Sequence, residues 1–60
     1  MDWLKELRLN KNMTIRYVAE QVGVTESFIS LLEHNKKRPS VALAKRLATL
    51  FDIDWTKFFD

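Results

Sequence analysis

The sequence predicts an all-α fold, and three observations support this class. Apolar residues recur at spacings of three and four along most of the chain, which is the pattern of helices with one buried side. Threonine and aspartate residues precede several of these stretches, where their side chains can cap a helix. No stretch alternates apolar and polar residues for long enough to compete as a β-strand.

The first two helices are predicted from their caps and their apolar stripes. Asp2 is expected to cap the first helix, which runs to about Lys11 and has three apolar residues on one side, Trp3, Leu4 and Leu7. Thr14 is expected to cap the second helix, whose buried stripe has the spacing i, i+3, i+4 and i+7: Ile15, Val18, Ala19 and Val22. Gly23 ends this helix, because glycine reaches positive φ without a steric penalty and permits a sharp turn.

The third helix is expected over residues 26–34, with Thr25 as its N-cap. Ile29 and Leu32 point inward together, because residues three apart lie on one face of a helix. The outer side carries Glu26, Ser27, Ser30, Leu31 and His34. Asn35 is expected to close the helix, since asparagine tolerates the left-handed conformation.

Two further helices are predicted in the C-terminal third. Pro39 holds Arg38 extended, so the fourth helix should begin at Ser40 and bury a stripe of five residues, Val41, Ala44, Leu47, Ala48 and Phe51. A second apolar row lies beside this stripe and consists of Leu43, Leu47 and Leu50. A short last helix, from Trp55 to Phe59, follows Asp54, and its aromatic residues are expected to close the core.

Length and composition limit the classes of function. Sixty residues make a single domain, 1–60, which buries only about 60% of the surface of its unfolded chain and leaves no room for the deep pocket of an enzyme. Without cysteine, and with His34 as its single histidine, the chain has no disulfide and no clustered zinc ligands. Ser30 and His34 share a helix, but no third group orients them as nucleophile and base. We expect no metal, no cofactor and no small-molecule ligand.

The chain also lacks the sequence features of membrane insertion. No apolar run approaches the ~18 residues of a membrane span, and the N-terminus has neither the positive region nor the apolar stretch of a signal peptide. The absence of cysteine fits a reducing compartment. We therefore expect a cytoplasmic protein with no membrane partner.

Positive charge is concentrated in one part of the sequence, although the net charge is only +2. Residues 35–46 include five basic residues and no acid: Lys36, Lys37, Arg38, Lys45 and Arg46. Residues 52–60 hold three acids against Lys57 alone. The basic part is suited to phosphate, whereas the acidic end should avoid it.

The second and third helices, joined by a turn at Gly23 and followed by a basic loop, have the layout of a helix-turn-helix. A helix fits the major groove of DNA, and a positive loop beside it can hold phosphate. The sequence therefore predicts a protein that binds double-stranded DNA.

The same residues resemble the Cro/repressor-type (Xre-like) helix-turn-helix family of phage repressors and bacterial regulators. The resemblance covers nearly the whole chain and rests on an ordered set of motifs: Leu4-x-x-Leu7-Arg8, Met13-Thr14, Val18-Ala19, Gly23-Val24-Thr25, Ile29-Ser30, Glu33, Lys36-Lys37-Arg38-Pro39-Ser40, Ala48, Phe51 and Ile53. It implies a compact five-helix bundle of the phage-repressor DNA-binding-domain type. It also implies a role in regulating transcription or in phage control, homodimers on palindromic operators, and an ion pair between Arg8 and Glu33. We expect a repressor, although these residues do not distinguish a repressor from an activator.

Two sets of residues are expected to contact DNA. The base-contacting set is Glu26, Ser27, Phe28, Ser30 and Leu31, and the phosphate-contacting set is Thr14, Ile15, Arg16, Thr25, Lys36, Lys37 and Arg38. The chain departs from the family at Ile15, where many members have glutamine. It also has no arginine or lysine on the third helix. For Phe28, partial packing in the core is as well supported as a base contact.

The excess of apolar residues near the C-terminus indicates a contact between two copies of the chain. We expect this dimer interface to include Leu43, Leu50 and Phe59. A rival interpretation uses the same fold as a protein–protein interaction module, with the face formed by Glu26, Phe28 and Leu31 docked on an apolar partner.

Overall fold

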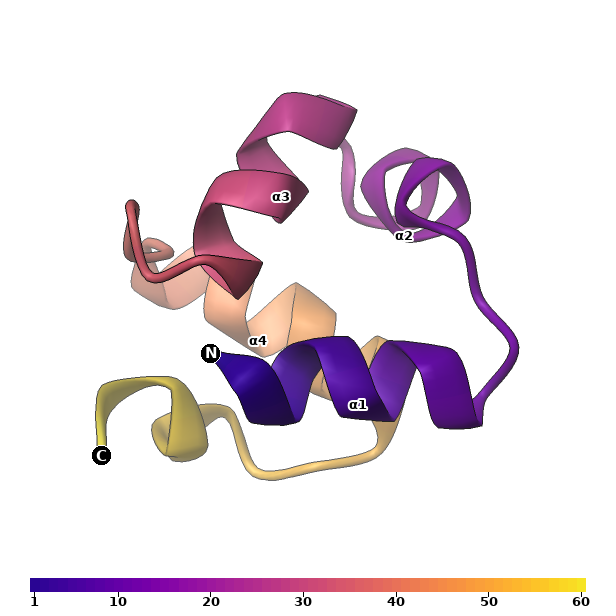
Figure 1. The fold of residues 1–60 in the computed structure, drawn as a ribbon. Coiled ribbons are helices and arrows are strands. Elements are labelled where there is room, and N and C mark those ends of the chain that lie inside the picture. The colour runs from indigo at the N-terminus through magenta and orange to yellow at the C-terminus, as the bar shows by residue number, and fades with distance from the viewer.

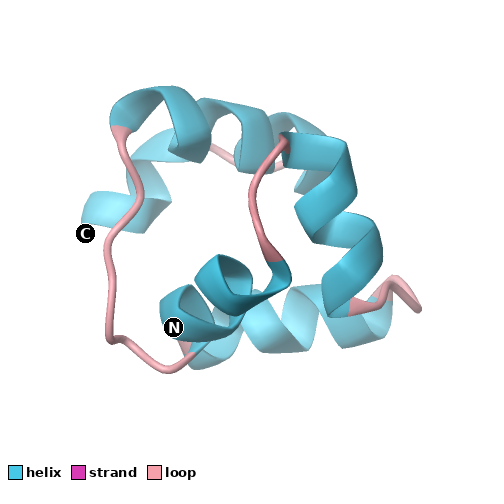
Figure 2. Ribbon diagram, turned by 90° about the horizontal axis from the view of Figure 1, so that it is seen from above, coloured by secondary structure: helices cyan, strands magenta, loops and turns pink.

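A computed structural model describes all 60 residues, from Met1 to Asp60. It contains helices and connecting turns, with no strand (Figure 2). The elements are α1 (Asp2–Asn10), α2 (Ile15–Val22), α3 (Glu26–Glu33), α4 (Val41–Phe51) and the 3-10 helix η1 (Trp55–Phe59). The all-α prediction is confirmed. The expected five-helix bundle is present in part, as four α-helices followed by a short 3-10 helix over the segment predicted for the last helix.

The helices are arranged around a common centre (Figure 1). α2 packs against α3 and α4, α1 packs against α3, and η1 folds back on α4. α3 forms one rim of the molecule, and α1 and η1 lie on the opposite side (Figure 1). As a result α3 has one side against the bundle and one side toward solvent.

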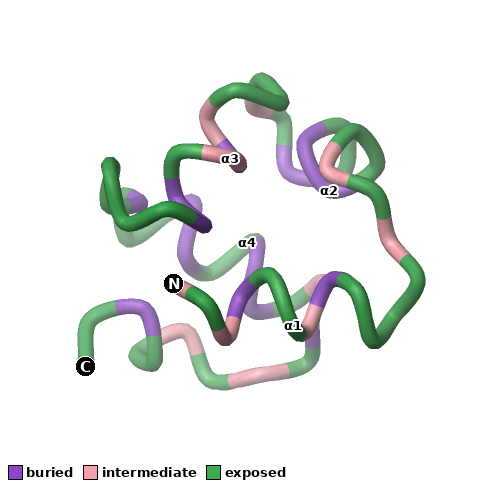
Figure 3. Tube along the Cα trace, viewed as in Figure 1, coloured by how far each residue is buried: buried purple, intermediate pink, exposed green.

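Figure 3 shows that every helix has buried positions along the trace. The core consists of twelve buried apolar residues contributed by every helix: Leu4, Val18, Ala19, Val22, Ile29, Leu32, Leu43, Ala44, Leu47, Ala48, Phe51 and Phe58. Phe58 of η1 meets Trp3 of α1 edge to face, with ring centroids 4.9 Å apart. Each large apolar side chain in this core contributes about 1.5–3 kcal/mol by leaving water.

None of the helices has the length and apolar character that a membrane-spanning helix requires.

Two of the three predicted N-caps, Thr14 and Thr25, are present, and Ser40, at which the fourth helix was expected to begin, caps α4. Thr14, Thr25 and Ser40 each accept a hydrogen bond from the backbone N–H three residues later, at 3.0, 3.1 and 3.1 Å. The prediction for Asp2 is wrong, because α1 already includes Asp2 and is preceded by Met1, which provides no side-chain cap. The carbonyl oxygen of Met1 accepts from the N–H groups of Leu4 and Lys5 at 3.0 and 3.4 Å, which places Met1 at the N-cap position. The amino group of Met1 also makes a distant contact, because it donates to the carbonyl oxygen of Glu33 at 3.0 Å.

Four of the five residues predicted for the buried side of α4 are buried, and the exception is Val41. Val41, expected in the core, is 48% exposed, whereas Leu43 is only 4% exposed. The buried stripe includes both Leu43 and Ala44, and the first turn of α4 carries Val41 on the outer side. This arrangement also corrects the prediction that Leu43 belongs to a dimer interface, since a side chain inside the core is unavailable to a second copy.

Candidate nucleic-acid interface

A sharp turn joins α2 to α3. Gly23 has φ 75° and ψ 36°, a left-handed conformation that is strained for residues with a side chain. The N–H groups of Gly23 and Val24 both donate to the carbonyl oxygen of Ala19, at 2.9 and 3.0 Å. Thr25 then caps α3. Only three residues therefore separate the two helices, and α3 leaves the turn in a fixed direction (Figure 1).

α3 has a core side and a solvent side. Ile29 and Leu32 are completely buried. On the other side, Glu26, Ser27 and Leu31 are exposed, and the outward edge of α3 appears exposed in Figure 3. Two predicted base-contacting residues, Phe28 and Ser30, are half-buried, and Phe28 packs against the core. The solvent side of α3 therefore consists of Glu26 and Ser27 in the first turn, together with Leu31.

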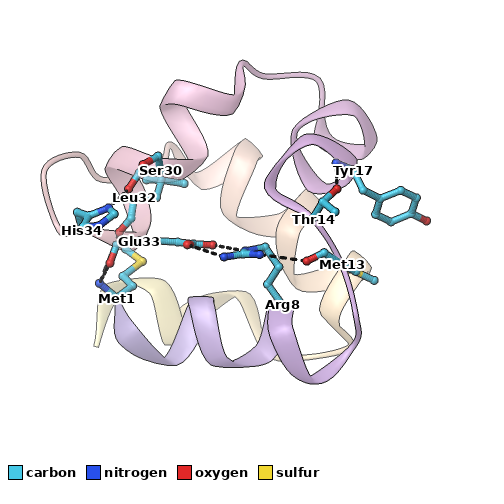
Figure 4. A network of polar contacts seen from close by, with 9 residues as sticks. All are labelled: Met1, Arg8, Met13, Thr14, Tyr17, Ser30, Leu32, Glu33 and His34. Carbon is cyan, nitrogen blue, oxygen red and sulfur yellow. Dashed lines mark hydrogen bonds and ion pairs between the residues drawn. The ribbon is translucent and has the colours of Figure 1, made fainter.

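A buried ion pair holds the C-terminal end of α3. Nε of Arg8 lies 2.7 Å from Oε2 of Glu33, and Nη2 of Arg8 lies 3.2 Å from Oε1 (Figure 4). The remaining arm of the guanidinium, Nη1, donates to the carbonyl oxygen of Met13 at 3.0 Å. The side chains of Arg8 and Glu33 are only 9% and 3% exposed. One arginine therefore joins α1, the turn before α2, and α3.

The basic loop after α3 is anchored by its backbone and by Pro39. Asn35 has φ 60°, as expected for the residue that closes α3, and the N–H of Lys36 donates to the carbonyl oxygen of Leu31 at 2.8 Å. Pro39 is buried. The side chains of Lys36, Lys37 and Arg38 are exposed and make no hydrogen bond or ion pair within the chain. Three positive charges are therefore held beside α3 and remain available to an anion.

The N-terminal end of α2 presents backbone donors. The N–H groups of Ile15 and Arg16 have no acceptor within the chain, while that of Tyr17 donates to Oγ1 of Thr14. The side chain of Ile15 is half-buried against the core. Ile15 can thus reach phosphate only through its backbone N–H, which the positive end of the helix dipole assists.

The sequence model of the helix-turn-helix family matches residues 4–58, which is nearly all of this arrangement. The chain belongs to the Cro/repressor-type (Xre-like) helix-turn-helix family. Members of this family are DNA-binding transcriptional regulators and not enzymes. α2 and α3 are accordingly the two helices that give the family its name, with α3 in the place of the recognition helix.

Three relatives illustrate this membership. The chain is 33% identical over 58 residues to the uncharacterized HTH-type transcriptional regulator YqaF of Bacillus subtilis, a match covering 97% of this chain and 76% of YqaF. It is 38% identical over 52 residues to the HTH-type transcriptional regulator AnsR of Bacillus subtilis, covering 87% and 45%. It is 30% identical over 56 residues to the HTH-type transcriptional regulator PuuR of Escherichia coli, covering 93% and 30%.

The shared region is only part of the longer relatives, since the chain spans less than half the length of AnsR and of PuuR. The similarity therefore concerns the helix-turn-helix domain. No solved structure matches the chain.

Arg16 of the helix-turn-helix is partly neutralised by acids. Its Nε lies 3.0 Å from Oε1 of Glu20, one turn along α2, in a pair that is exposed to solvent. The hydrogen bond and the charge of Glu20, together with the charge of Glu26, raise the pKa of Arg16 above its usual value. Arg16 must therefore leave or share Glu20 in order to contact a phosphate.

The basic cluster predicted from the sequence is divided in the structure. Nζ of Lys45 lies 5.1 Å from the ring centroid of Trp55, whereas Nη1 of Arg46 donates to the carbonyl oxygen of Val22 at 3.0 Å. Neither contact was predicted from the sequence. Only a general rule could have indicated the contact between Arg46 and Val22, namely that carbonyl groups at a helix C-terminus attract positive side chains.

The remaining predicted residues lie outside the buried core, and Leu50 packs against it. Leu50 is half-buried, and Phe59 is 37% exposed and meets Trp55 edge to face at 6.1 Å. Nδ1 of His34 lies 2.8 Å from the backbone carbonyl oxygen of Ser30, so the hydroxyl of Ser30 has no basic partner in this histidine.

Proposed function

We propose that this helix-turn-helix domain represses transcription by binding a specific palindromic operator as a homodimer, with residues 26–34 in the major groove. The observation that carries the proposal is the exposed side of α3, which is flanked by unpaired backbone donors at α2 and by the three unpaired side chains of the loop 36–38. A groove-sized element with phosphate-binding groups next to it is the arrangement that direct reading of DNA requires.

Phosphate contacts would supply most of the affinity. The loop provides Lys36, Lys37 and Arg38, and the start of α2 provides the backbone N–H groups after Thr14. The start of α3 offers the N–H groups of Glu26 and Ser27, which also have no acceptor within the chain. Because α3 has no basic side chain, these flanking groups must offset the repulsion between Glu26 and phosphate.

Base contacts would supply the specificity. The carboxylate of Glu26 can accept from the amino group of cytosine, the hydroxyl of Ser27 can donate or accept, and the methyl groups of Leu31 can contact a thymine methyl. The half-buried positions of Phe28 and Ser30 give them smaller contact areas. We expect a half-site in which cytosine and thymine face the first two turns of α3.

Dimer formation would double this readout. A two-fold axis would place the two α3 helices about 34 Å apart, one turn of the duplex, and would make the operator a near-palindrome. Leu50 and Phe59 are the proposed contact residues, because both retain apolar surface outside the core.

Selection of binding sites from random duplexes tests the proposal most directly. We expect an enriched palindromic motif, and for that site a slope near −5 in log affinity against log salt concentration, as for about six phosphate contacts. Sedimentation with and without the selected duplex measures the dimer. Failure to enrich any motif, combined with no binding at low salt, would refute the proposal.

A second candidate is favoured by one feature of α3, namely that Leu31 is 37% exposed on a helix with no basic residue. In this alternative, Glu26, Phe28 and Leu31 dock on an apolar surface of another protein. The two functions differ in salt dependence, because apolar docking changes little with salt whereas counterion release gives a steep slope.

A further inference from the structure

We infer that Arg46 is a positioning residue for DNA reading, which holds the turn between α2 and α3 from the side of α4. Nη1 of Arg46 donates to the carbonyl oxygen of Val22 at 3.0 Å, across 24 residues of sequence. Val22 is the last residue of α2, and Gly23 follows it. The contact therefore lies where the chain changes direction toward α3.

The carbonyl group of Val22 needs such a partner. The last four carbonyl groups of a helix lack intrahelical donors, and the two N–H groups that follow Val22 both donate to Ala19 instead. No backbone N–H donates to Val22. The guanidinium supplies the missing donor and also places a positive charge at the negative end of the α2 dipole.

The guanidinium also covers the turn itself. A Cβ atom built on Gly23 would lie 3.7 Å from Nη1 of Arg46, which places this side chain in van der Waals range of the turn. Arg8 holds the C-terminal end of α3 through Glu33. Arg46 acts at the N-terminal end, through the turn. Two arginines on different helices thus fix the direction of α3.

This role differs from a phosphate contact in what it changes. Loss of a phosphate contact weakens binding to all duplexes alike and lowers the salt slope by about one. Loss of a positioning contact lets α3 tilt relative to α2, which weakens the geometry-dependent base contacts more than the contacts to phosphate. The ratio of specific to non-specific affinity therefore distinguishes the two roles.

The test compares Arg46→Gln with Lys45→Gln, which removes the same charge from the neighbouring position of α4. Each variant is titrated with the selected duplex and with a random-sequence duplex of equal length, at a temperature where it is fully folded. Because a typical intramolecular hydrogen bond contributes about two- to tenfold in an equilibrium, we expect Arg46→Gln to weaken selected-site binding about three- to tenfold. Random-duplex binding should weaken less than about twofold, with the salt slope retained.

The controls separate positioning from charge and from folding. Lys45→Gln should weaken both duplexes equally and by less than about twofold, and Arg46→Lys should restore most of the specificity ratio, because an ammonium can also donate to Val22. Equal weakening of both duplexes by Arg46→Gln, or a salt slope lowered by one, would overturn the inference.

The specificity ratio rests on the proposed function, because it requires a selected operator. A measurement without DNA tests the role of Arg46 independently of that operator. In the free protein, hydrogen exchange at the N–H groups of Gly23 and Val24 should be several-fold faster in Arg46→Gln, with exchange in α4 unchanged. Unchanged exchange at the turn would refute the positioning role. Absence of a selected site would refute the specific operator, and the exchange rates would still decide the role of Arg46.

Discussion

Leu31 and Leu32 are neighbours in α3 with the same side chain but different surroundings. Leu32 is completely buried, and Leu31 is 37% exposed on the side proposed to enter DNA. Successive residues of a helix point about 100° apart, so one step along the chain separates core from solvent. The difference means that packing constrains one side of this eight-residue helix and leaves the other side available for the proposed recognition of DNA.

The core side of α3 ends in a charged residue, and this residue should be the most sensitive to replacement. Glu33→Ala leaves the Arg8 guanidinium buried with only the carbonyl oxygen of Met13, so we expect the free energy of unfolding to fall by about 3–5 kcal/mol. Urea denaturation measures it. Glu6→Ala, which removes an exposed acid from α1, is the control and should change stability little.

A double-mutant cycle decides whether the loss belongs to the pair. Arg8→Ala and Glu33→Ala should be strongly non-additive, because the second replacement removes a partner that is already lost. If Glu33→Ala proves too unstable to fold, Glu33→Gln keeps the shape of the side chain and serves in the cycle. Additive effects would show that Arg8 and Glu33 act separately.

The two leucines give the matched pair that tests the comparison directly. Leu32→Ala should lower the free energy of unfolding by about 2–5 kcal/mol, because it leaves a cavity in the core. Leu31→Ala should cost less than about 1 kcal/mol, since its side chain already contacts water.

Selection of sites from random duplexes should give the opposite result for the same two variants. Leu31→Ala is expected to alter the preferred base at one position of each half-site, whereas Leu32→Ala, at a temperature where it is folded, should retain the preference. A stability loss for Leu31 as large as that for Leu32 would show that the two sides of α3 are not independent.

The N-cap of α3 is Thr25, and its replacement should lower stability by an intermediate amount. Thr25→Ala removes the acceptor for the N–H of Phe28, and we expect a loss of about 1 kcal/mol in the free energy of unfolding. Thr25→Ser keeps the hydroxyl oxygen and should remain near the parent value. Thermal unfolding of the three proteins checks the order; an alanine variant as stable as the serine variant would contradict the capping role.

Local features of the fold were predictable, because they depend on neighbouring residues. The caps Thr14, Thr25 and Ser40, the turn at Gly23 and the inward direction of Ile29 all follow from short spacings. Features that depend on contacts between distant residues could not be predicted from the sequence. The amino group of Met1 reaches Glu33, and the packing of α4 against the other helices decides that Leu43 is buried and Val41 is exposed.

The candidate interface follows the same division. The exposed side of α3 and the loop 36–38 form contiguous segments, so periodicity and charge located them. The Arg8–Glu33 pair came only from the family resemblance, since periodicity does not join residues 25 apart. Arg46 could not be assigned, because one basic side chain serves equally well for phosphate or for a carbonyl group until the direction of α4 is known.

The smallest predicted effect concerns Arg16, which lies on the solvent side but is paired within the protein. In the parent protein the carboxylate of Glu20 binds Nε of Arg16 and raises the pKa of Arg16. Glu20→Gln removes this carboxylate, so the guanidinium becomes free to contact phosphate while it remains charged at neutral pH. We expect DNA affinity at low salt to rise about two- to fivefold, through one additional phosphate contact and one acid fewer near the duplex. The control Glu6→Gln removes the same charge from α1 and should raise affinity less. Equal gains in the two variants would mean that net charge alone is responsible, and that Arg16 does not exchange Glu20 for phosphate.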